Sequence, residues 1–273
     1  MSDGPLGIRH QRVQRLRRLL RRHSVRATDE AFVVEGVNVL EAALSAEAAI
    51  EAVYVAPEAR QHAGALRLVD EARRRGIRVY ELGAGVMERV ADTVTPQPVC
   101  AVATALDVPL DAVTSSGDDP RGATLLVCVD MRDPGNLGAM LRCADASGTA
   151  AVVCCEGTVD PYNPKVVRAS AGSLFNVPVV LAGAAGETFS RLAESGWRTL
   201  GTVARGGTDY SACDLTGRVA VVVGNEASGL PDELTGTLDS LVTIPMYGRT
   251  ESLNVAMAAT VLCFESARQR HAT

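Results

Sequence analysis

Five short, almost wholly apolar runs in the second half of this chain constrain its fold more than any other feature. They cover 125–129, 151–154, 177–181, 199–203 and 219–223. Runs of this kind are typical of parallel strands that are buried on both faces. Helical stretches alternate with them at 136–147, 164–171 and 186–195, and a last one, 252–269, places Leu253, Met257, Val261 and Phe264 on one apolar face. The alternation predicts an α/β fold in which helices cover both sides of a parallel sheet.

The first half of the chain repeats this alternation with shorter strands rich in β-branched residues. We expect strands at about 32–34, 52–55, 78–81 and 99–103, and helices at 38–46, 57–75 and 84–91. Between the halves, Ser, Gly, Asp and Pro gather without apolar periodicity, which is typical of a linker. The sequence therefore predicts a basic N-terminal arm or helix (1–30), a small α/β domain (31–105), a linker (106–122) and the parallel-sheet domain (123–273).

Charge is unevenly distributed along the chain. The whole chain carries a net charge of −5, yet residues 1–30 hold eight Arg against three acidic residues. Several of these arginines fall on one face if the segment is helical. A basic segment on an acidic protein suggests that a polyanion is bound at one place, although a solvated arginine-rich helix would look the same.

Several classes of protein are excluded by what the sequence lacks. No apolar run approaches the roughly 20 residues that span a bilayer, and residues 1–30 do not resemble a secretory signal, so we expect a cytoplasmic protein without membrane contact. The seven Cys and four His show no metal-ligand spacing, so we expect no metal and buried thiols. Neither a nucleotide-binding glycine fingerprint nor a phosphate-loop lysine motif occurs, and no His lies where Ser-His-Asp hydrolysis would need it.

Three polar, glycine-containing loops stand out in the second half: the first two follow predicted strands, and the third follows an apolar strand end at Ile244 and Met246. The first, 130–142, contains Asn136, expected to cap a helix, and Arg142; the second, 223–231, contains Gly224-Asn225-Glu226; the third, 244–256, contains Ser252. Ligands of open parallel sheets bind at the carboxyl ends of the strands, where these loops lie. Each loop alone is also explained by a helix cap or a tight turn.

Taken in order, the three loops resemble a known family. Asn136-Leu-Gly-x-x-x-Arg142, Gly224-Asn225-Glu226-x-x-Gly229 and Ile244-Pro-Met followed by Ser252-Leu-Asn-Val are similar to the three signature motifs of the SpoU (TrmH-type) RNA ribose 2′-O-methyltransferases. Phe32-Val-Val-Glu-Gly36 and Cys100-Ala-Val-Ala103 are similar to the substrate-binding domain of its ribosomal-RNA branch. The resemblance covers nearly the whole chain.

The resemblance implies a fold and a reaction. The fold would be a trefoil-knotted parallel-sheet methyltransferase domain of the SPOUT type, preceded by a small α/β RNA-binding domain. The cofactor would be S-adenosyl-L-methionine, bound in the loops of the knot, and the protein would be a homodimer with each active site near the interface. The reaction would transfer a methyl group to a ribose 2′-hydroxyl of structured RNA, and we expect 23S ribosomal RNA.

The same resemblance implies roles for individual residues. Arg142 is the position closest to the acceptor, and the family proposal makes it a general base; because guanidinium keeps its proton at ordinary pH, we interpret it as a phosphate clamp that stabilises developing negative charge. The other predicted catalytic residues are Asn136, Glu226, Ser252 and Asn254. The predicted cofactor-binding residues are Thr202, Val203, Gly224, Asn225, Ile244, Met246 and Leu253.

The predicted RNA-binding residues are arginines: Arg9, Arg12, Arg15, Arg18, Arg22, Arg26 and Arg168. With five Tyr, four Phe and one Trp, stacking of many single-stranded bases is disfavoured, and recognition of folded RNA by its shape fits better. A transfer-RNA ribose methyltransferase, a base methyltransferase of the wider knotted group, and an inactive RNA-binding module of the same fold are the alternatives. The sequence does not name the nucleotide, nor separate a housekeeping role from protection against an antibiotic.

Overall fold

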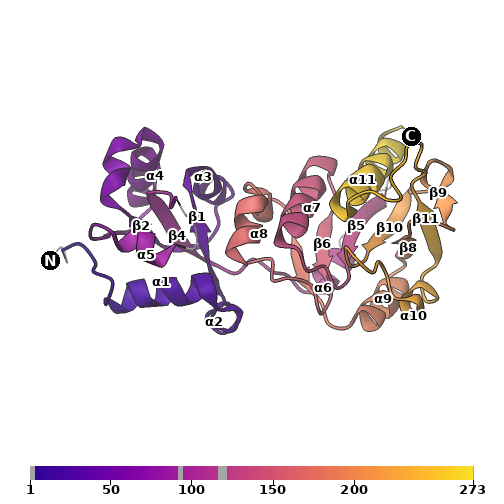
Figure 1. The fold of residues 1–273 in the computed structure, drawn as a ribbon, viewed down its shortest axis with the longest axis horizontal. Coiled ribbons are helices and arrows are strands. Elements are labelled where there is room, and N and C mark those ends of the chain that lie inside the picture. Colours follow the sequence, from indigo (N-terminus) through magenta and orange to yellow (C-terminus); the bar gives the residue numbers. More distant parts are fainter. Residues whose placement is uncertain (1–3, 92–94, 116–121, 273) are drawn as a thin grey trace. The chain divides into compact units, whose positions relative to one another are not determined.

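The chain forms two compact units (Figure 1). The computed structural model describes residues 4–91, 95–115 and 122–272, so 116–121 of the predicted linker lie outside the described residues. The first unit comprises Met1–Ala105 and Tyr162–Phe175, and the second comprises Leu106–Pro161 and Asn176–Thr273. The predicted domain boundaries stay a prediction, since contacts assign a segment from within 123–273 to the first unit.

A four-stranded sheet organises the first unit, in the order β1-β4-β2-β3. Its strands are β1 (Ala31–Glu35), β2 (Ile50–Val55), β3 (Arg78–Glu81) and β4 (Val99–Thr104), all close to their predicted positions. β4 is antiparallel to β1 and β2, whereas β2 and β3 are parallel. The helices between them are α3 (Val37–Ser45), α4 (Ala63–Arg74) and α5 (Val86–Val90).

The helix predicted at 57–75 is interrupted. A 3₁₀ turn, η1 (Pro57–Gln61), precedes α4, and His62 between them has extended backbone with φ −121°. The Nδ1 atom of His62 accepts a hydrogen bond from the amide of Ala65 at 3.2 Å. This side chain therefore satisfies a free amide at the start of α4, which begins a new helix where the sequence pattern indicated a continuous one.

The basic N-terminal segment is a packed part of the first unit. It forms α1 (Gln11–Arg21) and α2 (His23–Asp29). One stripe of α1 is buried among residues of β1, β2, β4 and α5, and it consists of Val13, Leu16, Leu19 and Leu20. Arginines occupy the rest of the helix surface, so the helix combines a core-forming face with a basic one.

A segment that lies between β6 and β7 in the sequence also packs into the first unit. It contains α8 (Pro164–Ala169) and the 3₁₀ turn η2 (Ser173–Phe175). The ring of Phe32 lies 4.7 Å from that of Tyr162 and 6.2 Å from that of Phe175, centroid to centroid. Arg168 forms an ion pair with the buried Glu35 at 3.0 Å.

The second unit contains a seven-stranded parallel sheet in the order β7-β6-β5-β10-β8-β11-β9. The five predicted runs form β5 (Gly122–Cys128), β6 (Ala151–Cys154), β7 (Val179–Leu181), β8 (Arg198–Thr202) and β10 (Gly217–Val223). Two further short strands, β9 (Thr208–Asp209) and β11 (Ser240–Thr243), extend the sheet beyond β8. The predicted α/β fold with a parallel sheet is confirmed.

Helices cover both faces of this sheet (Figure 1). On one face lie α7 (Pro134–Ser147) and α11 (Val255–His271), which pack against each other and against β5, β6 and β10. On the other lie α6 (Leu110–Thr114), α9 (Ala185–Glu194) and α10 (Asp232–Thr235), whose apolar residues share a core with Val127, Val222 and Trp197. The sheet is therefore buried on both sides, as its apolar strands require.

The apolar face predicted for the last helix is not its buried face. Met257 and Phe264 are 61% and 46% exposed, and Leu253 lies before the helix, which begins at Val255. The face that contacts the sheet and α7 consists mainly of small residues: Ala256, Ala259, Leu262, Cys263 and Ser266. Small side chains let α11 approach its neighbours closely, which leaves the large apolar side chains on the outer face.

Among the described residues, no helix is long and apolar enough to cross a membrane, and no three His, Cys, Asp or Glu residues are grouped to hold a metal ion. All seven cysteines are free thiols, and six of them are buried.

Candidate active site

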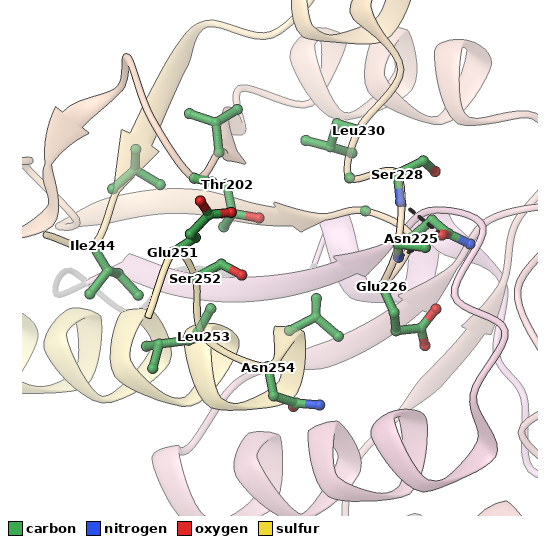
Figure 2. Close-up of a pocket in the computed structure, with 18 of the residues that line it drawn as sticks. Thr202, Asn225, Glu226, Ser228, Leu230, Ile244, Glu251, Ser252, Leu253 and Asn254 are labelled. Atoms are coloured by element: carbon green, nitrogen blue, oxygen red, sulfur yellow. Dashed lines mark hydrogen bonds between the residues drawn. The ribbon is translucent and has the colours of Figure 1, made fainter. Parts of the chain in front are cut away.

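A cavity of about 420 Å³ lies at the carboxyl edge of the parallel sheet, where β8, β10 and β11 end and α11 begins (Figure 2). Its volume falls in the range of small-ligand sites, roughly 300–1,000 Å³. The walls come from the loops that follow β8, β10 and β11 and from the first turns of α11. This is the edge at which open parallel sheets bind ligands.

Ten of the predicted site residues line this cavity. All seven predicted cofactor residues do so: Thr202, Val203, Gly224, Asn225, Ile244, Met246 and Leu253. Three of the five predicted catalytic residues do so as well: Glu226, Ser252 and Asn254. Asn136 and Arg142 are not part of its lining. Three loops that are separate in the sequence, those after β8, β10 and β11, thus meet at this cavity.

Gly224 is needed for the chain's own packing at this point. A Cβ atom there would overlap the carbonyl group of Gly229 and the amide nitrogen of Leu230. Asn225 and Gly229 exchange backbone hydrogen bonds of 3.0 and 2.9 Å, which fold residues 225–229 back over the end of β10. Gly224 is a predicted cofactor-binding residue, and the atoms nearest to the position of such a Cβ belong to this folded loop of its own chain.

Asn225 organises the loop through its side chain. Its Oδ1 accepts hydrogen bonds from the amides of Ala227 and Ser228, and its Nδ2 donates one to the carbonyl oxygen of Asp130 at 2.9 Å. Asp130 follows β5 and has a φ of +50°, a left-handed conformation that this contact helps to hold. The side chain of Asn225 therefore links the loop after β10 to the loop after β5.

A chain of hydrogen bonds joins the three sequence motifs. The Nδ2 of Asn136 on α7 donates to Oε1 of Glu226 at 3.1 Å, and Nδ2 of Asn254 donates to Oδ1 of Asn136 at 3.0 Å. Oδ1 of Asn254 in turn accepts from the amides of Ala256 and Met257 and so caps α11. Residues that are far apart in the sequence are thereby fixed in one polar cluster beside the cavity.

The helix caps differ from those expected. Asp133 caps α7 by accepting a hydrogen bond from the amide of Asn136 at 2.8 Å, so the helix begins at Pro134. This frees the side chain of Asn136 for the polar cluster. Asn254 caps α11, and the hydroxyl of Ser252 faces the cavity instead (Figure 2).

Glu226 is held as a carboxylate. Desolvation by itself would raise its pKa, but the hydrogen bond from Asn136 and those from the amides of Asp133 and Arg132 outweigh it, so its pKa is lowered from the ordinary value. A carboxylate with a lowered pKa is a weak base at neutral pH. Glu226 therefore serves best to orient Asn136 and the loop before α7.

Arg142 lies outside the cavity, exposed on α7. Among the described residues, no hydrogen bond or ion pair involves its guanidinium. The other exposed residues on this face of α7 are Gly135, Ala139 and Ala146, at helical spacing from Arg142. The guanidinium is therefore available to a group that approaches from outside the chain.

Sequence reasoning missed Glu251, which also lines the cavity. Figure 2 shows its carboxylate directed toward Thr202, on the side of the cavity away from Glu226. The sequence could have indicated Glu251 as a site residue, because it immediately precedes Ser252 in a loop that follows a strand.

The predicted RNA-binding arginines fall into three groups: one buried, three with partners in the chain, and three exposed. Arg26 is a correction: it is 5% exposed and donates a hydrogen bond to the carbonyl oxygen of Leu19 at 2.7 Å, so it joins α2 to α1. Arg15 is paired with Asp29 and Glu51, Arg12 lies over the ring of Tyr80, and Arg168 is paired with Glu35. Arg9, Arg18 and Arg22 are exposed, and their role in RNA binding stays a prediction.

Comparison with known proteins gives a consistent result. The profile of the SpoU rRNA methylase family matches residues 123–264, and that of the MRM3-like substrate-binding domain matches residues 10–101. The chain is 33% identical over 239 residues to the 23S rRNA (guanosine(2553)-2′-O)-methyltransferase RlmP of Bacillus subtilis, covering 88% of this chain and 89% of that protein. It is 32% identical to the 23S rRNA (guanosine-2′-O-)-methyltransferase RlmB of Vibrio cholerae, covering 88% and 98%.

Comparison with solved structures gives the same family as comparison of the sequences. The SpoU methyltransferase AviRb of Streptomyces viridochromogenes, in complex with the cofactor AdoMet, superposes with a TM-score of 0.84 at 28% identity, covering 96% of this chain and 99% of that one. An AdoMet-bound rRNA methyltransferase of Sinorhizobium meliloti superposes with a TM-score of 0.80 at 29% identity, covering 95% of each chain.

Proposed function

Since the chain belongs to the SpoU rRNA methylase family, we propose that it transfers a methyl group from S-adenosyl-L-methionine to a ribose 2′-hydroxyl of ribosomal RNA. Membership of the family also implies the trefoil knot of the C-terminal segment. The observation that carries the proposal is the polar cluster of Asn136, Glu226 and Asn254, which joins all three motifs beside one cavity.

The cavity fits this cofactor in size and chemistry. Ile244, Met246 and Leu253 offer an apolar surface for a purine ring, and ordinary small-ligand sites combine such walls with a few polar groups. The carboxylate of Glu251 and the hydroxyl of Ser252 supply polar groups on the same wall (Figure 2). When bound, the cofactor supplies a methyl group activated by its positive sulfonium.

The residues of the chain then have to position the acceptor and stabilise charge. As the 2′-oxygen bonds to the methyl carbon, the carbon–sulfur bond would break to leave a neutral thioether, and the hydroxyl proton would pass to water; partial negative charge builds on the oxygen while the proton leaves. Arg142 stabilises this charge and holds a neighbouring phosphate, since guanidinium binds phosphate with two parallel hydrogen bonds. Asn136, fixed by Glu226 and Asn254, orients the acceptor beside the methyl group.

The substrate class follows from the relatives. RlmP and RlmB are named as methyltransferases of 23S rRNA, and we propose 23S rRNA as the substrate and the cytoplasm as its location. Incubation with methyl-labelled cofactor and separated 23S, 16S and transfer RNAs tests this. We expect label in 23S rRNA; label confined to transfer RNA would overturn the choice of substrate.

The RNA-binding surface we propose is the basic face of α1 and the residue that follows it. Arg17, Arg18, Arg21 and Arg22 crowd the end of this helix, and among the described residues none of them is ion-paired. The arginines at the end of α4 and just after it, in contrast, are ion-paired: Arg73 with Asp70, and Arg74 and Arg75 with Glu71. Unpaired arginines are the ones free to release counterions from an RNA backbone.

This surface gives a testable expectation. The double substitution Arg18→Ala with Arg22→Ala should weaken rRNA binding and lower the slope of log K against log salt by about two, roughly one for each arginine that no longer binds a phosphate. Arg73→Ala with Arg74→Ala on α4 is the matched control and should leave the slope unchanged. Equal slopes in all three proteins would remove α1 from the interface. Deleting residues 1–26 is unsuitable, since it would remove Leu16 and Leu19 from the core.

We further propose a homodimer formed through the outer faces of α7 and α11. Met257 and Phe264 are exposed at helical spacing on α11, and the exposed face of α7 consists of small residues around Arg142. Small residues allow close approach of a second helix layer, and large apolar side chains favour burial. A second copy at this face would also bring groups to Arg142, which its own chain leaves unpaired.

The dimer is tested by one charged substitution. Phe264→Glu should shift the protein from dimer to monomer in sedimentation velocity, because a carboxylate in an apolar interface is strongly disfavoured. Leu66→Glu, at an exposed apolar position on α4, is the control and should stay dimeric. A wild-type protein that sediments as a monomer would refute the proposed interface.

A further inference from the structure

The charges that line the cavity are all negative. Among the described lining residues, only Glu226 and Glu251 carry a formal charge. Glu226 is occupied by hydrogen bonds from Asn136 and two backbone amides. Glu251 has no hydrogen-bond or ion-pair partner among the described residues, and its carboxylate faces the cavity (Figure 2). The nearest arginines in sequence, Arg205 and Arg249, are exposed and do not line it.

The start of α11 adds a positive electrostatic contribution, opposite in sign to that of the two carboxylates. The amino end of a helix carries a partial positive charge, equivalent to about half an elementary charge, and Val255 and Ala258 bring this end of α11 to the cavity wall. The side chain of Asn254 accepts hydrogen bonds from two of the free amides at this end, those of Ala256 and Met257. The carboxylates of Glu226 and Glu251 both oppose this positive end, and among the described residues only that of Glu251 accepts no hydrogen bond from the chain, so it is the one free to face a cationic ligand.

We infer that Glu251 gives the cavity a preference for the cationic methyl donor over the neutral thioether product. The inference rests on the proposed function and concerns the two forms of its cofactor. S-adenosylmethionine carries one net positive charge, and S-adenosylhomocysteine carries none, because loss of the methyl group turns the sulfonium into a thioether. A carboxylate in a partly enclosed cavity attracts the first and not the second. Glu251 thereby favours donor binding and product release.

Titration calorimetry on the full chain tests this with both ligands. Because Glu251 is exposed to solvent, Glu251→Gln should weaken binding of S-adenosylmethionine about two- to fivefold, while the affinity for S-adenosylhomocysteine should stay unchanged within error. Glu251 makes no contact that holds the fold, so the variant should melt like the wild type. Glu233→Gln on α10, exposed and outside the cavity, removes the same charge and should change neither affinity.

Salt provides a second readout of the same charge. The difference between wild type and Glu251→Gln toward S-adenosylmethionine should shrink at high ionic strength, because the cavity is open to solvent on one side. A substitution that weakens both ligands equally, or neither, would overturn the inference. A wild-type protein that binds neither ligand would instead overturn the proposed function, so the two failures are distinct.

Discussion

Replacing Arg142 with Ala is expected to reduce kcat for methyl transfer about 10²- to 10³-fold, the usual effect of removing one group that stabilises negative charge in a transition state. The affinity for S-adenosylmethionine should stay within about twofold of the wild type, because Arg142 lies outside the cavity. Single-turnover assays with rRNA and calorimetry with the cofactor measure the two quantities separately. Since its guanidinium has no partner among the described residues, the melting temperature should hardly change.

Two companion variants sharpen this experiment. Arg142→Lys keeps the charge but loses the planar pair of donors, so it should recover only part of the rate. Arg191→Ala, exposed on α9 at the other face of the sheet and paired with Asp111, should leave the rate unaffected. Turnover retained by Arg142→Ala would remove this residue from the mechanism. Loss of cofactor binding in the same variant would instead assign it to the cavity.

Replacing Gly224 with Ala is expected to weaken cofactor binding roughly 5- to 150-fold, since overpacking of this kind costs about 1–3 kcal/mol and each 1.4 kcal/mol is a factor of ten. The added methyl group meets backbone atoms of Gly229 and Leu230, which cannot rotate away as a side chain could. The loop of residues 225–229 has to move, and with it Glu226 and the cavity wall. Thermal stability should fall together with the affinity.

The matched control is another glycine in the same unit. Gly186 on α9 has open space where a Cβ would lie, and Ala is the better helix former, so Gly186→Ala should bind the cofactor like the wild type and be no less stable. Calorimetry and thermal unfolding of both variants provide the comparison. Normal cofactor binding by Gly224→Ala would show that the loop after β10 does not form the cavity wall.

Much of the second unit could be predicted because burial dictates its sequence. The runs that became β5, β6, β8 and β10 are apolar since both faces of the sheet are covered. β9 escaped prediction because it is a two-residue strand at the edge of the sheet with an exposed polar residue. β11 was indicated only by the apolar residues Ile244 and Met246 that follow it, since the strand itself is short and contains an exposed Ser240. The cofactor-binding residues were predicted from motif order, and all seven of them line one cavity.

The residues whose environment was predicted incorrectly share a physical cause: the type of a residue does not reveal which group of the folded chain it will contact. Arg26 resembles the other arginines of the basic segment, yet a carbonyl group of α1 binds its guanidinium in the core. Phe264 looks like a core residue, yet the smaller residues of α11 face the sheet. Similarly, the stacking of Phe32 with Tyr162 joins segments far apart in sequence, and no local pattern indicates it.

The most direct measurement of the site's chemistry is alkaline hydrolysis of rRNA methylated by this protein with labelled cofactor. A methyl group on a ribose 2′-oxygen blocks cleavage of the adjoining phosphodiester, so the label should appear in an alkali-resistant dinucleotide. This result is expected if Arg142 and the cluster of Asn136, Glu226 and Asn254 act on a sugar hydroxyl. Label recovered in mononucleotides would show that a base is methylated, and would contradict the assignment of this site to ribose.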